Sequence, residues 1–519
     1  MSHRLLVILS ELHYAANSIT PSNKLPPELM RAIFSFFCPG THCDWEKSLI
    51  MPYKDLLAVS HVCRHWREIA VSATELWTHI ILGHRTPVKS EASIARLCVR
   101  RSGGRPLDFF ITPTSVFAPP SAEELIPDRR RLKSVVYWYV GEAAGEELAS
   151  FLRPALHVER LEIRGDGISS LPTLFSGHAP CLRELVLSGS APWPNNRFGS
   201  LTSLSLLRQK DPDAHLYSLL DIMRCSPHLE EFFLERDFQP IEEPQHPPER
   251  EIPLIPLHLL KRLHICRLSA RATRRLLGAL DLLPNGISMK FSSISPEFGA
   301  TFPDAIAPEL SPRAATKLEV IYPPVGGAIL HATNGVAHTR WAHRFYPIYN
   351  QFFKWLAEKH HKAYPLKELW LHIGRSDFYE VPPPHTFHEL ETLVIETDPD
   401  ERSDSVVFLM ITPDEGGVPF PLLSTLELRN VCGVTKFGEV LKARSDAWCR
   451  LKTLRIRWFD GCEARMAPLV QFVDKLEFYH VGGRTSRGLE LPRECMTKRG
   501  RWEPWSLEFV EGFRESPHD

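Results

Sequence analysis

The chain has 519 residues, 43% hydrophobic and 24% charged, which allows roughly two or three soluble domains or one long repeat array. Its formal net charge of −1 gives it no overall attraction for nucleic acid or for an anionic membrane. The 11 cysteines are scattered without a CxxC pair, which favours a reducing compartment, so we expect a cytoplasmic or nuclear protein.

Residues 1–23 begin with a short apolar run at positions 5–9, followed closely by Glu11 and His13. The run is too short for the core of a signal peptide or for a membrane span. We therefore expect a helical arm that packs on the body of the protein, without membrane association.

The next segment has the pattern of two short helices. Pro26 and Pro27 suit a first helical turn, and apolar residues then recur at helical spacing as far as Phe37. A second stretch, residues 55–70, repeats apolar residues at intervals of three and four and includes Cys63 and Trp66. These helices carry more apolar surface than they can bury against each other. The surplus packs either on the rest of this chain or on another protein.

Both ends of this segment carry a signature. Residues 25–29 read Leu-Pro-Pro-Glu-Leu, and residues 62–67 read Val-Cys-Arg-His-Trp-Arg. In this order they resemble an F-box, a small helical module, over residues 24–80. Residues 38–54 form a longer connector than is usual in that family. The resemblance implies that the module docks on the Skp-type adaptor of a cullin–RING ubiquitin ligase.

The same resemblance assigns one set of residues to the adaptor interface and its supporting core, two roles that the sequence does not separate. The set is Leu25, Pro26, Glu28, Ile33, Phe34, Leu56, Val59, Cys63 and Trp66.

Residues 81–130 read as a linker between the module and the rest of the chain. Within it, Ile94, Leu97 and Cys98 predict a helix, and residues 106–111 predict an extended segment. The prolines between positions 106 and 127 favour loops, because proline can neither continue a helix nor donate to a sheet.

Residues 131–480 contain a recurring Leu-x-x-Leu-x-Leu frame, from its first occurrence at residues 132–137 to its last at residues 473–478. Most intervals lie near the ~20–29 residues of leucine-rich repeats. We predict an irregular α/β leucine-rich-repeat solenoid, in which short parallel strands line an inner surface and helices lie outside. An ordinary α/β domain with coincidental leucine spacing remains the alternative.

Two intervals between frames are longer than the others. The first contains Ile287, Met289 and Phe291, which predict one further strand. The second contains residues 341–361, whose apolar spacing predicts a long helix. Residues 481–519 are expected to cap the last repeat and to end in a tail, because a repeat array needs its open end covered.

The sequence shows no phosphate loop, nucleophile elbow or dinucleotide fingerprint. Cys38, His42, Cys43, His61 and Cys63 match no common zinc spacing. No nucleophile and base are placed to suggest a hydrolase. We therefore expect a non-catalytic protein that uses neither a metal nor a cofactor.

Residues between and after the frame leucines point away from the core of a repeat. Exposed aromatic side chains are enriched at recognition sites, and paired arginines can bind a carboxylate or a phosphate. The alternative for the arginines is that Glu427 and Glu477 neutralise them. The candidates for target binding are Phe233, His264, Trp370, His372, Arg429, Arg455 and Arg457.

Together, the two regions resemble the F-box/leucine-rich-repeat class of substrate receptors. The resemblance implies a substrate-recognition subunit of an SCF-type ubiquitin ligase. In that class the module binds the Skp-type adaptor and, through it, the cullin and RING subunits, while the repeats hold a target protein. The competing hypothesis is a non-catalytic scaffold or inhibitor whose F-box-like helices only cap the array.

Overall fold

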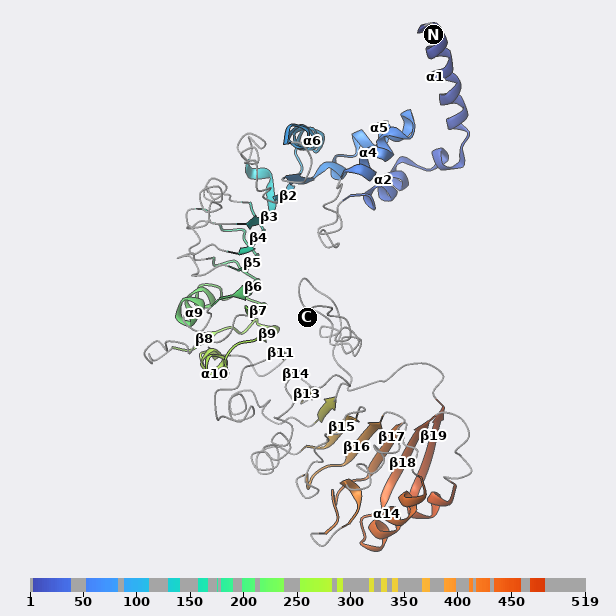
Figure 1. The fold of residues 1–519 in the computed structure, drawn as a ribbon, viewed down its shortest axis with the longest axis vertical. Helices are drawn as coiled ribbons and strands as arrows, with labels where there is room; N and C mark the ends of the chain where they lie inside the picture. The colour runs from blue at the N-terminus through green and yellow to red at the C-terminus, as the bar shows by residue number, and fades with distance from the viewer. Residues whose placement is uncertain are drawn as a thin grey trace. The chain divides into compact units, whose positions relative to one another are not determined.

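The structure of the protein is a computed structural model, shown in Figure 1. The chain divides into two compact units. Unit 1 comprises Met1–Asp211 and Tyr217–Leu229, and unit 2 comprises Pro212–Leu216 and Glu230–Asp519. The residues described are 3–38, 53–82, 88–111, 129–140, 157–166, 175, 179–189, 198–210, 215–237, 253–281, 287–292, 317–321, 328–333, 338–343, 366–373, 387–397, 410–413, 417–429, 434–458 and 467–480.

Unit 1 begins with a helical region. Its elements are α1 (His3–Ser18), η1 (Pro21–Lys24), α2 (Pro27–Ser35), α4 (Lys54–His61), α5 (Arg64–Ser72) and η2 (Thr74–Trp77).

The rest of unit 1 is a parallel sheet in which the strands pair in chain order. Its elements are β1 (His79–Leu82), α6 (Val88–Arg101), β2 (Leu107–Ile111), η3 (Arg129–Arg131), β3 (Leu132–Val140), β4 (Arg160–Asp166), β5 (Glu184–Ser188), β6 (Ser203–Gln209) and α9 (Leu216–Arg224).

Unit 2 contains a second series of paired strands. Its elements are β7 (Glu231–Arg236), β8 (Ile255–Pro256), β9 (Arg262–Cys266), α10 (Ala270–Gly278), β10 (Leu280–Asp281), β11 (Ser288–Ser292), β12 (Lys317–Ile321), β13 (Ala328–Thr333), β14 (His338–His343), β15 (Glu368–Ile373), β16 (Thr392–Thr397), β17 (Thr425–Arg429), α14 (Val434–Asp446), β18 (Leu451–Trp458), η6 (Ala467–Phe472) and β19 (Val473–His480).

The strands of unit 2 are parallel except at one place. They pair in the order β7, β9, β11, β14, β13, β12, β15, β16, β17, β18 and β19, and β13 runs antiparallel to both of its neighbours. A separate short pair joins β8 and β10. Figure 1 shows β15 to β19 side by side.

The frame leucines explain why these segments become strands. Leu161, Leu185 and Leu204 lie opposite one another on β4, β5 and β6, and all three are buried. One strand cannot hide its own apolar residues, so each leucine is covered by the leucine of the next strand. Every frame in the sequence overlaps a strand, and the further strand expected near Met289 is β11. The prediction of an α/β region with parallel sheets is therefore confirmed.

The structure differs from the sequence interpretation around two connections. The sheet begins before the predicted boundary at 131, because β1 and β2 pair with each other and β2 pairs with β3. In unit 2, residues 341–343 lie in β14 rather than in a helix, and residues 344–361 of the predicted helix lie outside the described residues. The unpredicted β13 has no leucine frame, and only pairing with two neighbours identifies it.

The helical region departs from the expectations in two further ways. The stretch 55–70 is two helices rather than one, because Cys63 adopts an extended conformation between α4 and α5. The terminal arm forms the predicted helix α1, and its Leu5, Ile8 and Leu12 are exposed, so the expected packing on the body is not seen for these residues. The predicted cap at 481–519 lies outside the described residues.

Candidate partner-binding site

The helical region has a small apolar core of its own. Met30 and Phe34 on the inner face of α2 are buried, as are Leu56 and Val59 on α4. The ring of Phe34 lies 5.3 Å from that of Trp66 on α5, in a tilted arrangement. Aromatic pairs at this separation add to the stability gained from burying their surface. Phe34, Leu56 and Val59 therefore belong to the supporting core.

A chain of hydrogen bonds fixes the segment that precedes α2. The indole Nε1 of Trp66 donates to the side-chain oxygen of Asn23 over 2.5 Å. The side-chain nitrogen of Asn23 donates in turn to the carbonyl oxygen of Asn17 over 2.6 Å. Asn23 thus ties the end of α1 to α5, in the segment that leads into α2.

Cys63 closes the corner between α4 and α5. Its sulfur accepts a hydrogen bond from the backbone N–H of Trp66 at 3.4 Å, so it caps the start of α5. The side chain of Arg67 donates to the carbonyl oxygen of Ser60 over 3.0 Å and secures the same corner from the α4 side. The half-buried Cys63 and Trp66 therefore set the geometry of this corner.

The outer face of α2 carries large apolar side chains that nothing in the described part of the chain covers. Leu29 is 53% exposed, Ile33 40% and Phe36 87%. These residues lie on the side of the helix next to that of Met30 and Phe34, so α2 and its C-terminal end are apolar on two adjacent faces. Pro26 and Glu28 are also exposed at its start. Together with the exposed Phe37, this outer face is the best candidate for contact with a partner.

The structure thus sorts the predicted adaptor residues by exposure. Pro26, Glu28 and Ile33 lie at the surface, and Leu25 is half-buried. The sequence interpretation did not include Leu29 or Phe36 in this set. Their helical spacing with Ile33, which places all three on one side of the helix, was the signal that could have indicated them.

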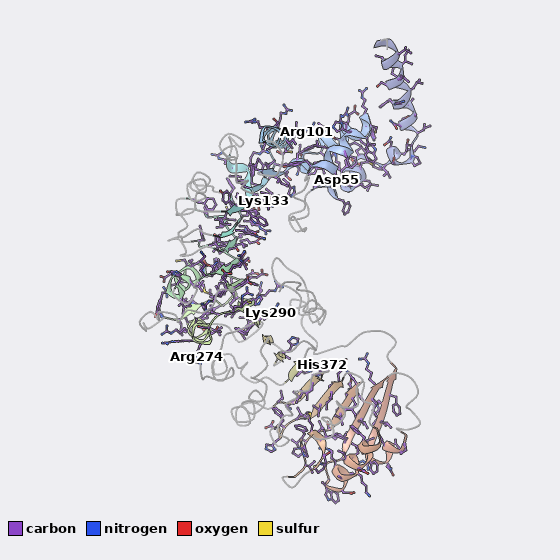
Figure 2. All side chains as sticks on the ribbon, viewed as in Figure 1. Asp55, Arg101, Lys133, Arg274, Lys290 and His372 are labelled. Carbon is purple, nitrogen blue, oxygen red and sulfur yellow. The ribbon has the colours of Figure 1, made fainter. Side chains whose placement is uncertain are left out.

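A different face joins the helical region to the sheet of unit 1. The hydroxyl of Tyr53 donates to the carbonyl oxygen of His79 over 3.0 Å and accepts from the N–H of Ile81 over 2.7 Å. The guanidinium carbon of Arg101, labelled in Figure 2, lies 4.4 Å from the ring centre of the buried Trp77. The contacts to the sheet therefore leave the outer face of α2 uncovered.

Two cysteines at this junction are structural rather than reactive. Burial, together with the charge of Glu75, raises the pKa of Cys38 to about 11. Burial raises the pKa of Cys98 to about 12. Both thiols therefore stay protonated near neutral pH, which makes them poor metal ligands. His42 and Cys43 lie outside the described residues.

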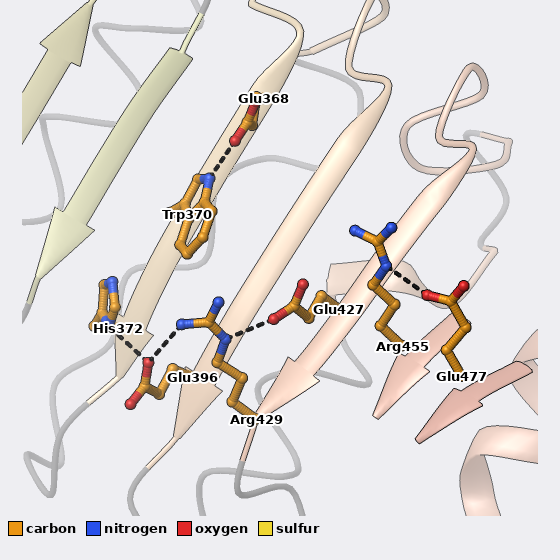
Figure 3. A network of polar contacts seen from close by, with 8 residues as sticks. All are labelled: Glu368, Trp370, His372, Glu396, Glu427, Arg429, Arg455 and Glu477. Atoms are coloured by element: carbon orange, nitrogen blue, oxygen red, sulfur yellow. Dashed lines mark hydrogen bonds and ion pairs between the residues drawn. The ribbon is translucent and has the colours of Figure 1, made fainter. Parts of the chain in front are cut away.

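The second candidate surface is the strand face of unit 2, where Figure 3 shows a network of polar contacts. Arg429 is 5% exposed, and its guanidinium donates to Glu427 over 2.8 Å and to Glu396 over 3.4 Å. The guanidinium carbon lies 4.7 Å from the ring centre of Trp370, close enough for a cation–π contact. Trp370 donates its indole N–H to Glu368 over 2.6 Å.

This network determines the charge of Glu396. His372 Nδ1 lies 3.3 Å from the Glu396 carboxylate. Burial alone would raise the pKa of Glu396, but the hydrogen bonds and charges of His372 and Arg429 hold it below its usual value. Arg429 is therefore already neutralised inside the protein, as the alternative for the arginines stated.

The remaining residues predicted on this face are also engaged. Arg455 donates to Glu477 over 2.9 Å, and Arg457 lies in register beside Arg429. Nearer the start of unit 2, the rings of Phe233 and His264 lie 4.3 Å apart in an edge-to-face arrangement. An anionic ligand would have to displace internal carboxylates from Arg429 and Arg455.

The sheet of unit 1 repeats this arrangement at a place that the sequence interpretation missed. The guanidinium carbon of Arg164 lies 5.4 Å from the ring centre of Trp138, and Phe110 lies 6.1 Å from the same tryptophan. The buried Glu162 pairs with Arg160 and Arg164. Trp138 directly follows the frame residue Tyr137, just as His372 follows Leu371. This shared position in the repeat was the sequence signal that could have indicated Trp138.

The part of the chain that the structure describes lacks two further kinds of site. No helix there combines the length and apolar character needed to cross a bilayer. No group of three histidine, cysteine or acidic side chains there could hold a metal ion.

Comparison with known proteins identifies one part of the chain. The family model for the F-box-like domain matches residues 22–83, a span that includes the core around Phe34 and the outer face of α2. A search of curated proteins finds no match. The chain therefore carries an F-box-like domain at its N-terminal side, followed by an α/β region with parallel sheets.

Proposed function

We propose that this protein is the substrate-recognition subunit of an SCF-type ubiquitin ligase. The observation that carries the proposal is the exposed apolar outer face of α2, within a domain that matches the F-box-like family. Domains of this family generally bind Skp-type adaptors. Burying a side chain such as Leu29 or Phe36 contributes about 1.5–3 kcal/mol, so covering this face would drive docking.

The α/β region would then act as a leucine-rich-repeat arc that holds a target protein. The parallel pairing and the row of Leu161, Leu185 and Leu204 support this part of the proposal. The protein itself would perform no chemistry. It would act by raising the local concentration of the target near the cullin and RING subunits, in the cytoplasm or the nucleus.

The competing role is a scaffold or inhibitor whose helical domain only caps the array. Tyr53 does bond to His79 on β1, and Trp77, which also bonds to Ala70, does contact Arg101 on α6. The domain therefore touches the start of the sheet, as a cap would. A cap, however, has no need for a second apolar face, and the outer face of α2 exposes Leu29, Ile33 and Phe36. This exposure favours docking over capping alone.

The test is co-purification of the full chain with a recombinant Skp-type adaptor. We expect a complex with the wild-type protein, and its loss in Ile33→Asp with Phe36→Asp. Val71→Asp on α5 is the matched control, because Val71 is also exposed but lies outside the outer face of α2. Failure of the wild-type chain to bind the adaptor would leave the scaffold role.

A further inference from the structure

The backbone at Trp448 has a conformation that suits another residue. Trp448 follows α14 with a φ of 59°, in the left-handed region. Its N–H donates to the carbonyl oxygen of Ser445 over 3.1 Å, and the N–H of Cys449 donates to that of Arg444 over 2.9 Å. This pair of bonds ends a helix in the Schellman arrangement, where glycine is preferred because it has no Cβ to clash.

The side chain of Trp448 also adds no stability to the protein on its own, because it is not buried. It is 95% exposed, although tryptophan is the largest apolar side chain. The position therefore loses stability through its backbone and gains none through burial. Such a double conflict between sequence and local structure is typical of positions that serve a function.

Two neighbouring turns also expose apolar side chains at the end of the sheet where its strands begin, called here its edge. Leu422 is 60% exposed before β17, and Val470 is 57% exposed before β19, while Trp448 precedes β18. These strands pair in order, Thr425 with Thr453 and Leu451 with Val473. The three side chains, named here the edge cluster, therefore lie on adjacent turns at the strand starts.

The edge cluster has a rigid support. Arg444, in the last turn of α14, is buried and donates to the carbonyl oxygens of Pro419 over 2.5 Å and Phe420 over 3.0 Å. These bonds tie the helix that precedes Trp448 to the turn that carries Leu422. A surface held in place in this way loses little conformational freedom when a partner binds.

The charges around the edge cluster indicate the kind of partner. The exposed charged residues within four positions of its members include two acidic and two basic side chains, Asp446, Arg450, Lys452 and Asp474, and Arg450 pairs with Asp474 at 2.9 Å. A balanced rim offers no net attraction to nucleic acid or to an anionic membrane. An aromatic centre with a polar rim of mixed charge is the anatomy of a protein interface.

We propose that the edge cluster binds a partner polypeptide, whose apolar pocket receives the indole of Trp448. Calling this partner the target rests on the proposed function, while the surface itself is separate from the outer face of α2. The edge is also the better site for the target, because the arginines Arg429 and Arg455 on the strand face are already paired with carboxylates.

The test replaces Trp448 by glycine in the full chain. Because glycine fits the left-handed backbone, we expect Trp448→Gly to melt at a higher temperature than the wild type. Proteins recovered with the wild type are identified, purified and titrated against each variant by calorimetry. At least one should bind Trp448→Gly roughly tenfold or more weakly, as expected for an interface tryptophan. Leu254→Ala is the matched control, since Leu254 is 64% exposed elsewhere in unit 2, and it should bind normally.

Several results would overturn the inference. A lower melting temperature of Trp448→Gly would show that the indole is structural. If no purified partner binds Trp448→Gly more weakly than Leu254→Ala, the edge cluster is not its site. Binding to phosphatidylcholine vesicles, or a dimer in light scattering, that the glycine variant abolishes would assign the surface to a membrane or to a second copy. Adaptor binding, measured on the same samples, reports on the proposed function separately.

Discussion

The outer face of α2 and the strand face of β15–β19 both carry residues that look suited to recognition. They differ in whether other residues of the protein already contact them. On α2, Leu29, Ile33 and Phe36 remain exposed. On the strands, Arg429 and Arg455 each have a carboxylate partner, as Figure 3 shows. A binding surface is thus better recognised by what is left uncovered than by the chemical type of its residues.

The largest expected effect tests which face of α2 supports the fold. Phe34→Ala removes a fully buried ring beside Trp66 and should lower the free energy of unfolding by about 3–5 kcal/mol. Phe36→Ala on the exposed outer face should change it by less than about 0.5 kcal/mol. Urea denaturation of both variants measures the difference. Equal losses would contradict the division of α2 into a core face and an outer face.

A second comparison concerns the strand face. Arg429→Ala leaves Glu396 and Glu427 without their cation and should cost about 3 kcal/mol of unfolding free energy. Arg450→Ala breaks the ion pair with Asp474, whose members are 42% and 61% exposed, and should cost less than about 1 kcal/mol. Chemical denaturation checks both values. A loss no larger than that of Arg450→Ala would contradict the role of Arg429 as an internal partner of these carboxylates.

The pH dependence of stability tests the pairing of Glu396 with His372 and Arg429. The pKa of Glu396 is below its ordinary value of 4.5 in the folded protein, because His372 and Arg429 favour its charged form. Its contribution is therefore present above pH 4.5 and is lost as the pH falls through the folded pKa. We expect the wild type to be more stable than Glu396→Gln near neutrality, with the two curves converging in acid. Parallel curves from pH 7 to pH 3 would contradict this.

The smallest expected effect lies beside the outer face of α2. Asn23→Ala removes the acceptor for the Trp66 indole N–H and should cost about 1 kcal/mol of unfolding free energy. It should also weaken adaptor binding, because the segment that leads into α2 loses its tie to Trp66 on α5. Ser22→Ala is the neighbouring control. Titration calorimetry with the adaptor measures the change in affinity. An unchanged affinity would show that Asn23 does not support the adaptor-binding surface.

The sequence alone determined the parts that depend on local periodicity. The leucine frames placed the strands, because alternating apolar residues must face a common core, as Leu161 and Leu185 do. The spacing around Met30 and Phe34 likewise showed that α2 has more apolar surface than its own core can cover.

Only the tertiary structure decided the features that depend on contacts between distant residues. Glu396 lies opposite Arg429 through strand pairing, and the sequence around Arg429 does not show which carboxylates reach it. The break at Cys63 was also hidden, since Cys63 fits the helical spacing of residues 55–70, and the sequence around Trp448 does not indicate its left-handed backbone. Periodicity specifies which side of an element is apolar, whereas pairing and exposure depend on what folds against it.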